Sequence, residues 1–144
     1  MAFNLNSKKL ADTTTLHLRD PGDDSLLFDV DAKGNPDESK PVTIELYGRA
    51  SKQYRAYMAK ILRKAEKEKD ANRGKAKSRT FDEMTQENAQ FLATVSIKAN
   101  NVELNGGPVD SEAAFVSLYA DPAFDWIGDQ VSAALADNGN FLAE

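Results

Sequence analysis

Apolar and polar side chains alternate in the segment PVTIELYG, residues 41–48, which is the period-2 pattern of a half-buried β-strand. TLHLR, residues 15–19, shows a shorter alternation, and SLLFDV, residues 25–30, follows it after the turn sequence DPGD. We therefore expect a small antiparallel meander of three strands within residues 13–48, with a polar loop at residues 31–40. Such a sheet has one apolar face, which helices or another subunit must cover.

A helical spacing of apolar residues begins after Ser51, whose side chain can cap the first turn of a helix. The apolar positions follow the spacing i, i+3, i+4, i+7, i+8 and i+11, so they form one stripe that we expect to be buried. This stripe consists of Tyr54, Tyr57, Met58, Ile61, Leu62 and Ala65. Residues 67–80 are charged and poor in apolar side chains, and we expect a fraying helix end and a mobile basic loop there.

Thr80, with a glutamate three residues later, forms a capping box for a second helix. The apolar stripe of this helix runs from Phe81 to Ala99. Residues 105–108, Asn-Gly-Gly-Pro, then predict a tight turn. A third helix is expected to begin near Ser111.

The last predicted helix begins at the Asp-Pro pair of residues 121–122, which suits a helix N-terminus. Its apolar stripe consists of Phe124, Ile127, Val131 and Leu135. Trp126, the single tryptophan of the chain, falls on a different face of this helix. A second contact within the molecule and a contact with a partner both explain this placement, because tryptophan is usually buried and is also enriched at binding hot spots.

The length of 144 residues fits a single α+β domain, with a small N-terminal antiparallel β-meander, residues 13–48, packed by three to four C-terminal α-helices within residues 51–137. Cysteine is absent and His17 is the single histidine, which argues against a disulfide framework, a metal centre and a catalytic triad. We therefore expect a non-enzymatic protein with no cofactor. No apolar stretch is as long as a membrane span, and no signal-peptide core is present, so we expect a cytosolic protein.

Charge is divided unevenly along the chain, whose 18 basic and 23 acidic residues give a net charge of −5. Residues 49–79 carry 12 basic and 3 acidic side chains, a local charge of +9, whereas residues 80–144 carry 1 basic and 11 acidic side chains, a local charge of −10. The basic segment fits either a nucleic-acid footprint or a solvated helix face with acidic neighbours. The second interpretation is favoured, because Tyr54 and Tyr57 lie on the stripe expected to be buried instead of forming stacking platforms.

Four phrases of the sequence, taken in order, resemble the tail assembly chaperones of long-tailed, siphovirus-like bacteriophages. They are TLHLRDP, KPVTIELYGRASKQYR, NVELNGGPV and LYADPAFDWIGDQVSAALADNGNFLAE. The last phrase is the most specific of the four. The likeness covers most of the chain apart from residues 31–40 and 67–80.

This resemblance implies a non-enzymatic role in the host cytoplasm during assembly. Such chaperones bind the long, helical, apolar tape measure protein, help to recruit tail tube protein, and are absent from the mature virion. In many such phages a longer, frameshifted form exists, and this chain would correspond to the short form. Two other classes stay open: a small nucleic-acid-associated phage protein that uses the basic helix within residues 49–79, and a structural tail or head component that is retained in the virion.

The candidate partner-binding residues belong to two groups. The apolar candidates are Tyr119, Phe124, Trp126 and Ile127, and the charged candidates are Arg55, Arg63, Lys64, Asp125 and Asp129. The segments of opposite charge would also allow self-association, in which the basic helix of one copy meets the acidic half of the next. Such heterologous contacts can build a helical array. Neutralisation of the two segments within one chain explains the charges equally well.

Overall fold

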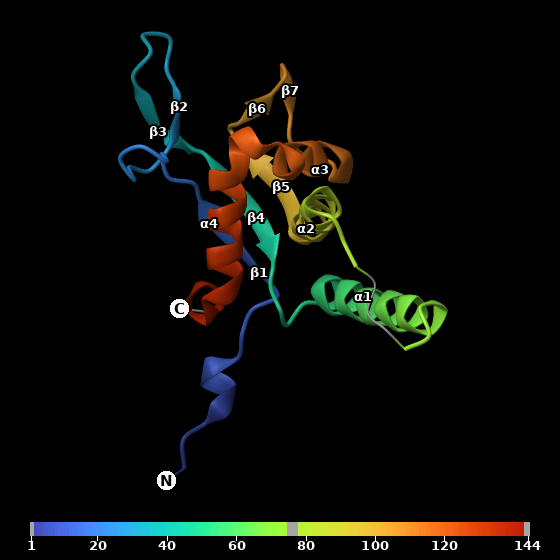
Figure 1. Cartoon of the computed structure of the whole chain (residues 1–144). Coiled ribbons are helices and arrows are strands. Elements are labelled where there is room, and N and C mark those ends of the chain that lie inside the picture. The colour runs from blue at the N-terminus through green and yellow to red at the C-terminus, as the bar shows by residue number, and fades with distance from the viewer. Residues whose placement is uncertain (1, 75–77, 143–144) are drawn as a thin grey trace.

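A three-stranded antiparallel sheet in the order β1–β4–β5 lies at the centre of the computed structural model, which describes residues 2–74 and 78–142. The strands are β1 (Thr13–His17), β4 (Thr43–Tyr47) and β5 (Ser96–Asn100). The alternation in residues 41–48 correctly predicts β4, whose Ile44 and Leu46 are buried while Glu45 stays partly exposed. As the middle strand, β4 is covered at both edges (Figure 1).

Two hairpins extend from one end of this sheet (Figure 1). The first pairs β2 (Phe28–Val30) with β3 (Pro36–Pro41), and the second pairs β6 (Glu103–Leu104) with β7 (Gly107–Pro108). The second hairpin confirms the predicted tight turn: Asn105 and Gly106 both have positive φ, 53° and 81°, as a two-residue hairpin loop with primed geometry requires.

The predicted α+β class is confirmed, but the predicted meander is wrong in two places. The segment 25–30 supplies β2 to a separate hairpin with β3, which begins inside the expected loop 31–40. The third strand of the central sheet is β5, in residues that we expected to end the second helix. Val95 and Ala99 are spaced four apart, which suits a helix, but they also alternate with Ser96 and Lys98, and the open edge of β4 favours the strand.

In the part of the chain that the structure describes, four α-helices complete the fold: α1 (Lys52–Ala71), α2 (Phe81–Val95), α3 (Glu112–Ala120) and α4 (Asp125–Ala136). Three of them begin at a side-chain cap, since Ser51, Thr80 and Ser111 each accept a hydrogen bond from a backbone N–H of the first turn. Helices α2, α3 and α4 bury one face each with the sheet. Residues of this core that are fully buried include Leu46, Leu92, Val95, Phe115 and Val131.

Helix α1 projects sideways from the rest of the fold (Figure 1) and contains no buried residue. The prediction that its apolar stripe is buried is therefore wrong. The helix also continues to Ala71, so the first part of the expected loop 67–80 is helical, and residues 75–77 of that loop lie outside the described residues. Spacing shows that apolar side chains share a face, but it does not show that anything covers that face.

The described residues also form three short 3-10 helices: η1 (Leu5–Lys8) before β1, η2 (Pro122–Phe124) before α4, and η3 (Asn138–Phe141) after α4. Phe141 of η3 is buried, and its ring packs directly on Gly48, which follows β4. The backbone N–H of Ala11 donates to the carbonyl of Phe141 at 2.6 Å, so the chain just before β1 is joined to η3. No helix within residues 2–74 and 78–142 combines the length and the apolar content that crossing a membrane requires.

Candidate partner-binding site

The contact between α1 and α2 is built around the ring of Phe91. Tyr54 packs edge-on against it with ring centroids 5.6 Å apart, and the tilted ring of Tyr57 lies 5.5 Å away. Burial raises the pKa of the Tyr57 hydroxyl, and the neighbouring carboxylates of Glu87 and Glu112 raise it further. These three rings hold the base of α1 on the fold.

Beyond this contact, apolar side chains of both helices remain uncovered. Leu62 is 66 % exposed, Phe81 is 78 % exposed and Met84 is 50 % exposed. Phe81 and Met84 are three residues apart on α2 and share a face with Phe91. We call this region the α1–α2 apolar surface, which consists of Tyr57, Met58, Ile61, Leu62, Phe81 and Met84.

Two hollows give this surface the shape of a groove. One, of about 290 Å³, lies between the helices and is lined by Tyr57, Met58, Ile61, Met84, Glu87, Asn88 and Phe91. The other, of about 440 Å³, follows α1 and is lined by Arg49, Tyr54, Arg55, Met58, Ala59 and Leu62. Because Met58 lines both hollows, they adjoin one another on α1.

Arg79 fastens the outer part of α1 to α2. Its guanidinium contacts Glu68 of α1 at 2.8 Å through Nη2 and Glu87 of α2 at 2.8 Å through Nε. The hydrogen bond that Arg79 donates to the Glu87 carboxylate is the main cause that raises the pKa of Arg79, and the charges of both carboxylates add to it. This pair of charge-assisted hydrogen bonds links the outer part of α1 to α2.

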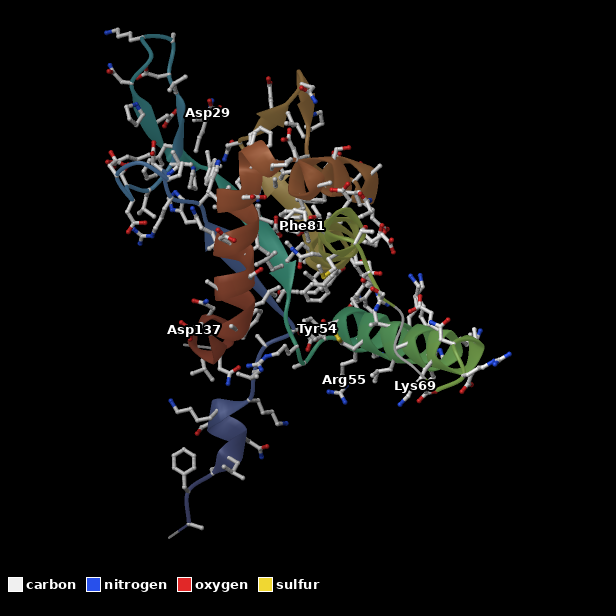
Figure 2. All side chains as sticks on the ribbon, viewed as in Figure 1. Asp29, Tyr54, Arg55, Lys69, Phe81 and Asp137 are labelled. Atoms are coloured by element: carbon white, nitrogen blue, oxygen red, sulfur yellow. The ribbon has the colours of Figure 1, made fainter. Side chains whose placement is uncertain are left out.

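The predicted basic residues lie on α1, but only one of them borders the groove. Arg55 lines the larger hollow together with Arg49, and Figure 2 shows Arg55 pointing away from the fold beside Tyr54. Arg63 and Lys64 are exposed on α1 and line neither hollow. The groove therefore has a basic rim at the base of α1.

The predicted apolar residues lie elsewhere, at the junction of α3 and α4, and two of them are core residues. Tyr119 is buried, its ring stacks on Phe115 at 5.8 Å, and its hydroxyl shares a hydrogen bond of 2.7 Å with Ser96 Oγ. Burial raises the pKa of Tyr119 to about 12, although the hydrogen bond to Ser96 acts in the opposite direction. Ile127 is also buried. This corrects the expectation that Tyr119 and Ile127 are docking residues, because neither presents an accessible surface.

Phe124 and Trp126 are half-buried and border a separate cavity of about 210 Å³, which we call the Trp126 cavity. Its lining is apolar apart from one carboxylate and consists of Leu18, Leu27, Phe28, Val42, Ile44, Ala99, Val102, Glu103, Leu104, Val109, Leu118, Phe124, Trp126 and Ile127. One turn along α4, the Gln130 side chain accepts from the backbone N–H of Arg19 and donates to the Arg19 carbonyl, both at 2.8 Å. The face of α4 that carries Trp126 therefore meets the chain just after β1.

The remaining polar candidates are solvated or structural. Asp125 and Asp129 are exposed on α4. His17 is partly buried, with Nε2 2.7 Å from the Leu27 carbonyl and its ring edge-on to Phe28. Within residues 2–74 and 78–142, no group of three or more histidine, cysteine, aspartate or glutamate side chains is arranged to hold a metal ion.

Comparisons with protein-family models, curated proteins and solved structures found no match to this chain. The assignment of the groove as a candidate binding site therefore rests on the exposed residues and hollows described above. The sequence analysis placed Phe81 and Met84 on the buried stripe of the second helix, and Ile61 and Leu62 on the buried stripe of the first, and all four predictions are wrong because these side chains are exposed. One sequence signal indicated that the outer part of α1 is exposed. The segment after Ala65 is charged and poor in apolar side chains, so it has none that could pack over the end of this helix.

Proposed function

We propose that this chain is a phage tail assembly chaperone that holds apolar helical segments of the tape measure protein on the α1–α2 apolar surface. The observation that supports this most strongly is that large apolar side chains on both helices remain exposed, and that two of them, Leu62 and Met84, line two adjoining hollows. Contiguous apolar surface with a polar rim marks a binding site in a soluble protein.

The shape of the surface suits a helix as its occupant. A groove between two helices receives the apolar face of a third helix, whose side chains at i, i+3, i+4 and i+7 enter the hollows. The three-ring contact around Phe91 and the Arg79 bridge fix both ends of the groove before a partner arrives. Less ordering is then needed on binding, which favours affinity.

The basic rim indicates the charge of the partner. Arg49 and Arg55 line the larger hollow, so a helix with carboxylates beside its apolar stripe is complemented best. Charges on the rim of an interface mainly raise the rate of association and select the partner. In the proposed role, release of the tape measure protein to tail tube subunits follows in the host cytoplasm, and the chaperone does not enter the virion.

The alternative nucleic-acid function receives less support from the structure. Single-stranded nucleic acid is bound by exposed aromatic rings between basic side chains. Tyr54 and Tyr57 instead pack on Phe91, and the exposed residues nearest to Arg55 on the groove are aliphatic. A retained structural component differs from a chaperone in one observable respect, namely its presence in purified mature particles.

Co-expression with the tape measure protein tests the proposal. We expect the wild-type chain to keep the tape measure protein in the soluble fraction and to co-purify with it. The double variant Leu62→Gln, Phe81→Gln should lose both effects, whereas Leu26→Gln, a change of the same kind outside the groove, should keep them. The proposal would be refuted if the double variant solubilised the tape measure protein as well as the wild type does.

A further inference from the structure

Helix α1 is attached to the rest of the fold at two places. At its base, the rings of Tyr54 and Tyr57 pack on Phe91 of α2. Farther out, Glu68 is bonded to Arg79, which lies directly before the N-cap of α2. Tyr57 and Glu68 are 11 residues apart in the chain, which is about 16 Å along a helix. A long stretch of α1 therefore lies between the two attachments.

The outer part of α1 is covered at the second attachment. Within residues 59–71, Glu68 is the one residue that is not exposed to solvent. The Glu68 side chain is 19 % exposed and the Arg79 side chain is 28 % exposed. Salt screens an ion pair that is covered to this extent less than it screens a fully exposed pair.

Arg79 joins this part of α1 to a wall of the smaller hollow. Its Nη2 donates to Oε2 of Glu68 at 2.8 Å, and its Nε donates to Oε1 of Glu87 at 2.8 Å. Glu87 lines the hollow between the helices, whereas Arg79 lines neither hollow. Because both bonds come from one planar guanidinium, the position of Glu68 is tied to that of Glu87.

The residues with which α1 forms the groove lie between the two attachments. Met58 and Ile61 line the smaller hollow together with Met84 of α2, and Leu62 lines the larger hollow. A helix that is held at its base alone can turn about that contact. Such a turn moves Ile61 and Leu62 relative to Met84, so the shape of the groove depends on how α1 is set against α2.

We propose that Arg79 is a positioning residue of the groove, whose bonds to Glu68 and Glu87 hold α1 at the distance from α2 at which a partner helix fits. When the bridge is broken, α1 turns on Phe91 and the binding-competent arrangement becomes a minor population. The apparent Kd of a partner then rises by the inverse of that population. This role rests on the proposed function for its partner, but the position of α1 can be measured without one.

The position of α1 can be measured with spin labels at two introduced cysteines, because the chain has none of its own. Lys69→Cys labels the outer end of α1, where Figure 2 shows Lys69, and Ala133→Cys labels an exposed position on α4. By double electron–electron resonance, we expect a narrow distance distribution in this labelled background and a broad one when Arg79→Gln or Glu68→Gln is added. Lys67→Gln, which removes an exposed positive charge next to Glu68, is the matched control and should stay narrow.

A double variant separates a direct link from a general weakening of the fold. Arg79→Gln and Glu68→Gln remove the same tie between α1 and α2, so the two changes together should broaden the distribution no more than either change alone. Distributions that stay narrow in both single variants would overturn the proposal. Broadening that adds up in the double variant would overturn it as well.

Titration with a soluble helical fragment of the tape measure protein gives the second readout. We expect Arg79→Gln and Glu68→Gln each to weaken the Kd about tenfold, as the loss of one charge-assisted hydrogen bond predicts. The fraction of molecules that keep the wild-type distance should account for the weakening, and Lys67→Gln should bind as the wild type does. An unchanged Kd in variants whose α1 has moved would overturn the proposal. A wild-type chain that fails to bind the fragment would count against the chaperone function, while the spin-label distances still decide whether Arg79 positions α1.

Discussion

The α1–α2 apolar surface can be made polar without disturbing the core, because its most exposed residues contribute little to the folded monomer. Leu62 is 66 % exposed and Phe81 is 78 % exposed, and the fold keeps its contacts through Phe91 when both are changed. Glutamine at both positions keeps a good helix former in α1 and α2 while removing the apolar surface. Each change should alter the free energy of unfolding by no more than about 0.5 kcal/mol.

The effect on partner binding follows from the exposed fractions. Full burial of a leucine or phenylalanine side chain is worth about 1.5–3 kcal/mol. Since roughly two thirds to three quarters of each side chain is still available for burial, each should contribute about 1–2 kcal/mol to a complex. The pair then contributes about 2–4 kcal/mol, which corresponds to a Kd weakened by about 30-fold to several hundred-fold.

The assay measures both quantities on the same proteins. Urea unfolding gives the stability, and titration with a soluble helical fragment of the tape measure protein gives the Kd. Leu26→Gln, at a side chain that is 42 % exposed outside the groove, should leave the Kd unchanged but cost about 1–2 kcal/mol of stability, because more than half of the leucine is buried. Leu92→Ala, which removes a fully buried side chain, should cost about 2–5 kcal/mol of stability. A double variant that binds as tightly as the wild type, or that unfolds as readily as the Leu92 variant, would refute the reasoning.

Three further predictions concern the core and the charged rim. The pKa of Tyr119 is about 12 in the folded chain and about 10 in the unfolded chain, so between pH 10 and pH 12 the hydroxyl loses its proton in the unfolded state only. The free energy of unfolding should therefore be highest below pH 10 and fall by about 2–3 kcal/mol as the pH rises to 12. Urea unfolding across this range should show the loss in the wild type and a smaller loss in Tyr119→Phe. Gly48→Ala places a methyl group 2.5 Å from the Phe141 ring, so it should cost about 1–3 kcal/mol of stability in thermal unfolding, and less when Phe141→Leu is present. Arg49→Glu with Arg55→Glu should slow association with the tape measure fragment in stopped-flow measurements at about 0.1 M salt, and the difference should shrink near 1 M salt, where the Debye length falls from about 10 Å to about 3 Å.

Local signals in the sequence predicted the starts of α1, α2 and α3 well, whereas the Asp-Pro pair of residues 121–122 begins η2 and α4 starts only at Asp125. Ser51, Thr80 and Ser111 all act as N-caps, because capping depends on residues within a single turn. The alternation also predicted β4, whose two edges are both paired in the middle of the sheet and whose Ile44 and Leu46 are buried. These features need no knowledge of what lies far away in the chain.

Pairing and burial were harder to predict because they depend on distant segments. The local pattern of residues 96–100 suits the end of a helix, and only their pairing with β4 makes them the strand β5. The local pattern of residues 25–30 suits a strand of the meander, but β2 pairs with β3 instead. The stripe on α1 has the spacing of a buried face, yet no other described element covers its outer half. Trp126 lies outside the buried stripe of α4 because its side chain lines the Trp126 cavity instead. The spacing of apolar residues in α4 does not predict this cavity, since most of its lining comes from other segments.

A photo-crosslinking amino acid placed at position 62 tests the central claim most directly, because it reports which molecule touches the groove during assembly. Illumination of cells that make this chain and the tape measure protein should give a covalent adduct between the two when the crosslinker replaces Leu62, and none when it replaces Leu26. Adducts that form equally from both positions, or from neither, would contradict the claim that the α1–α2 apolar surface holds the partner.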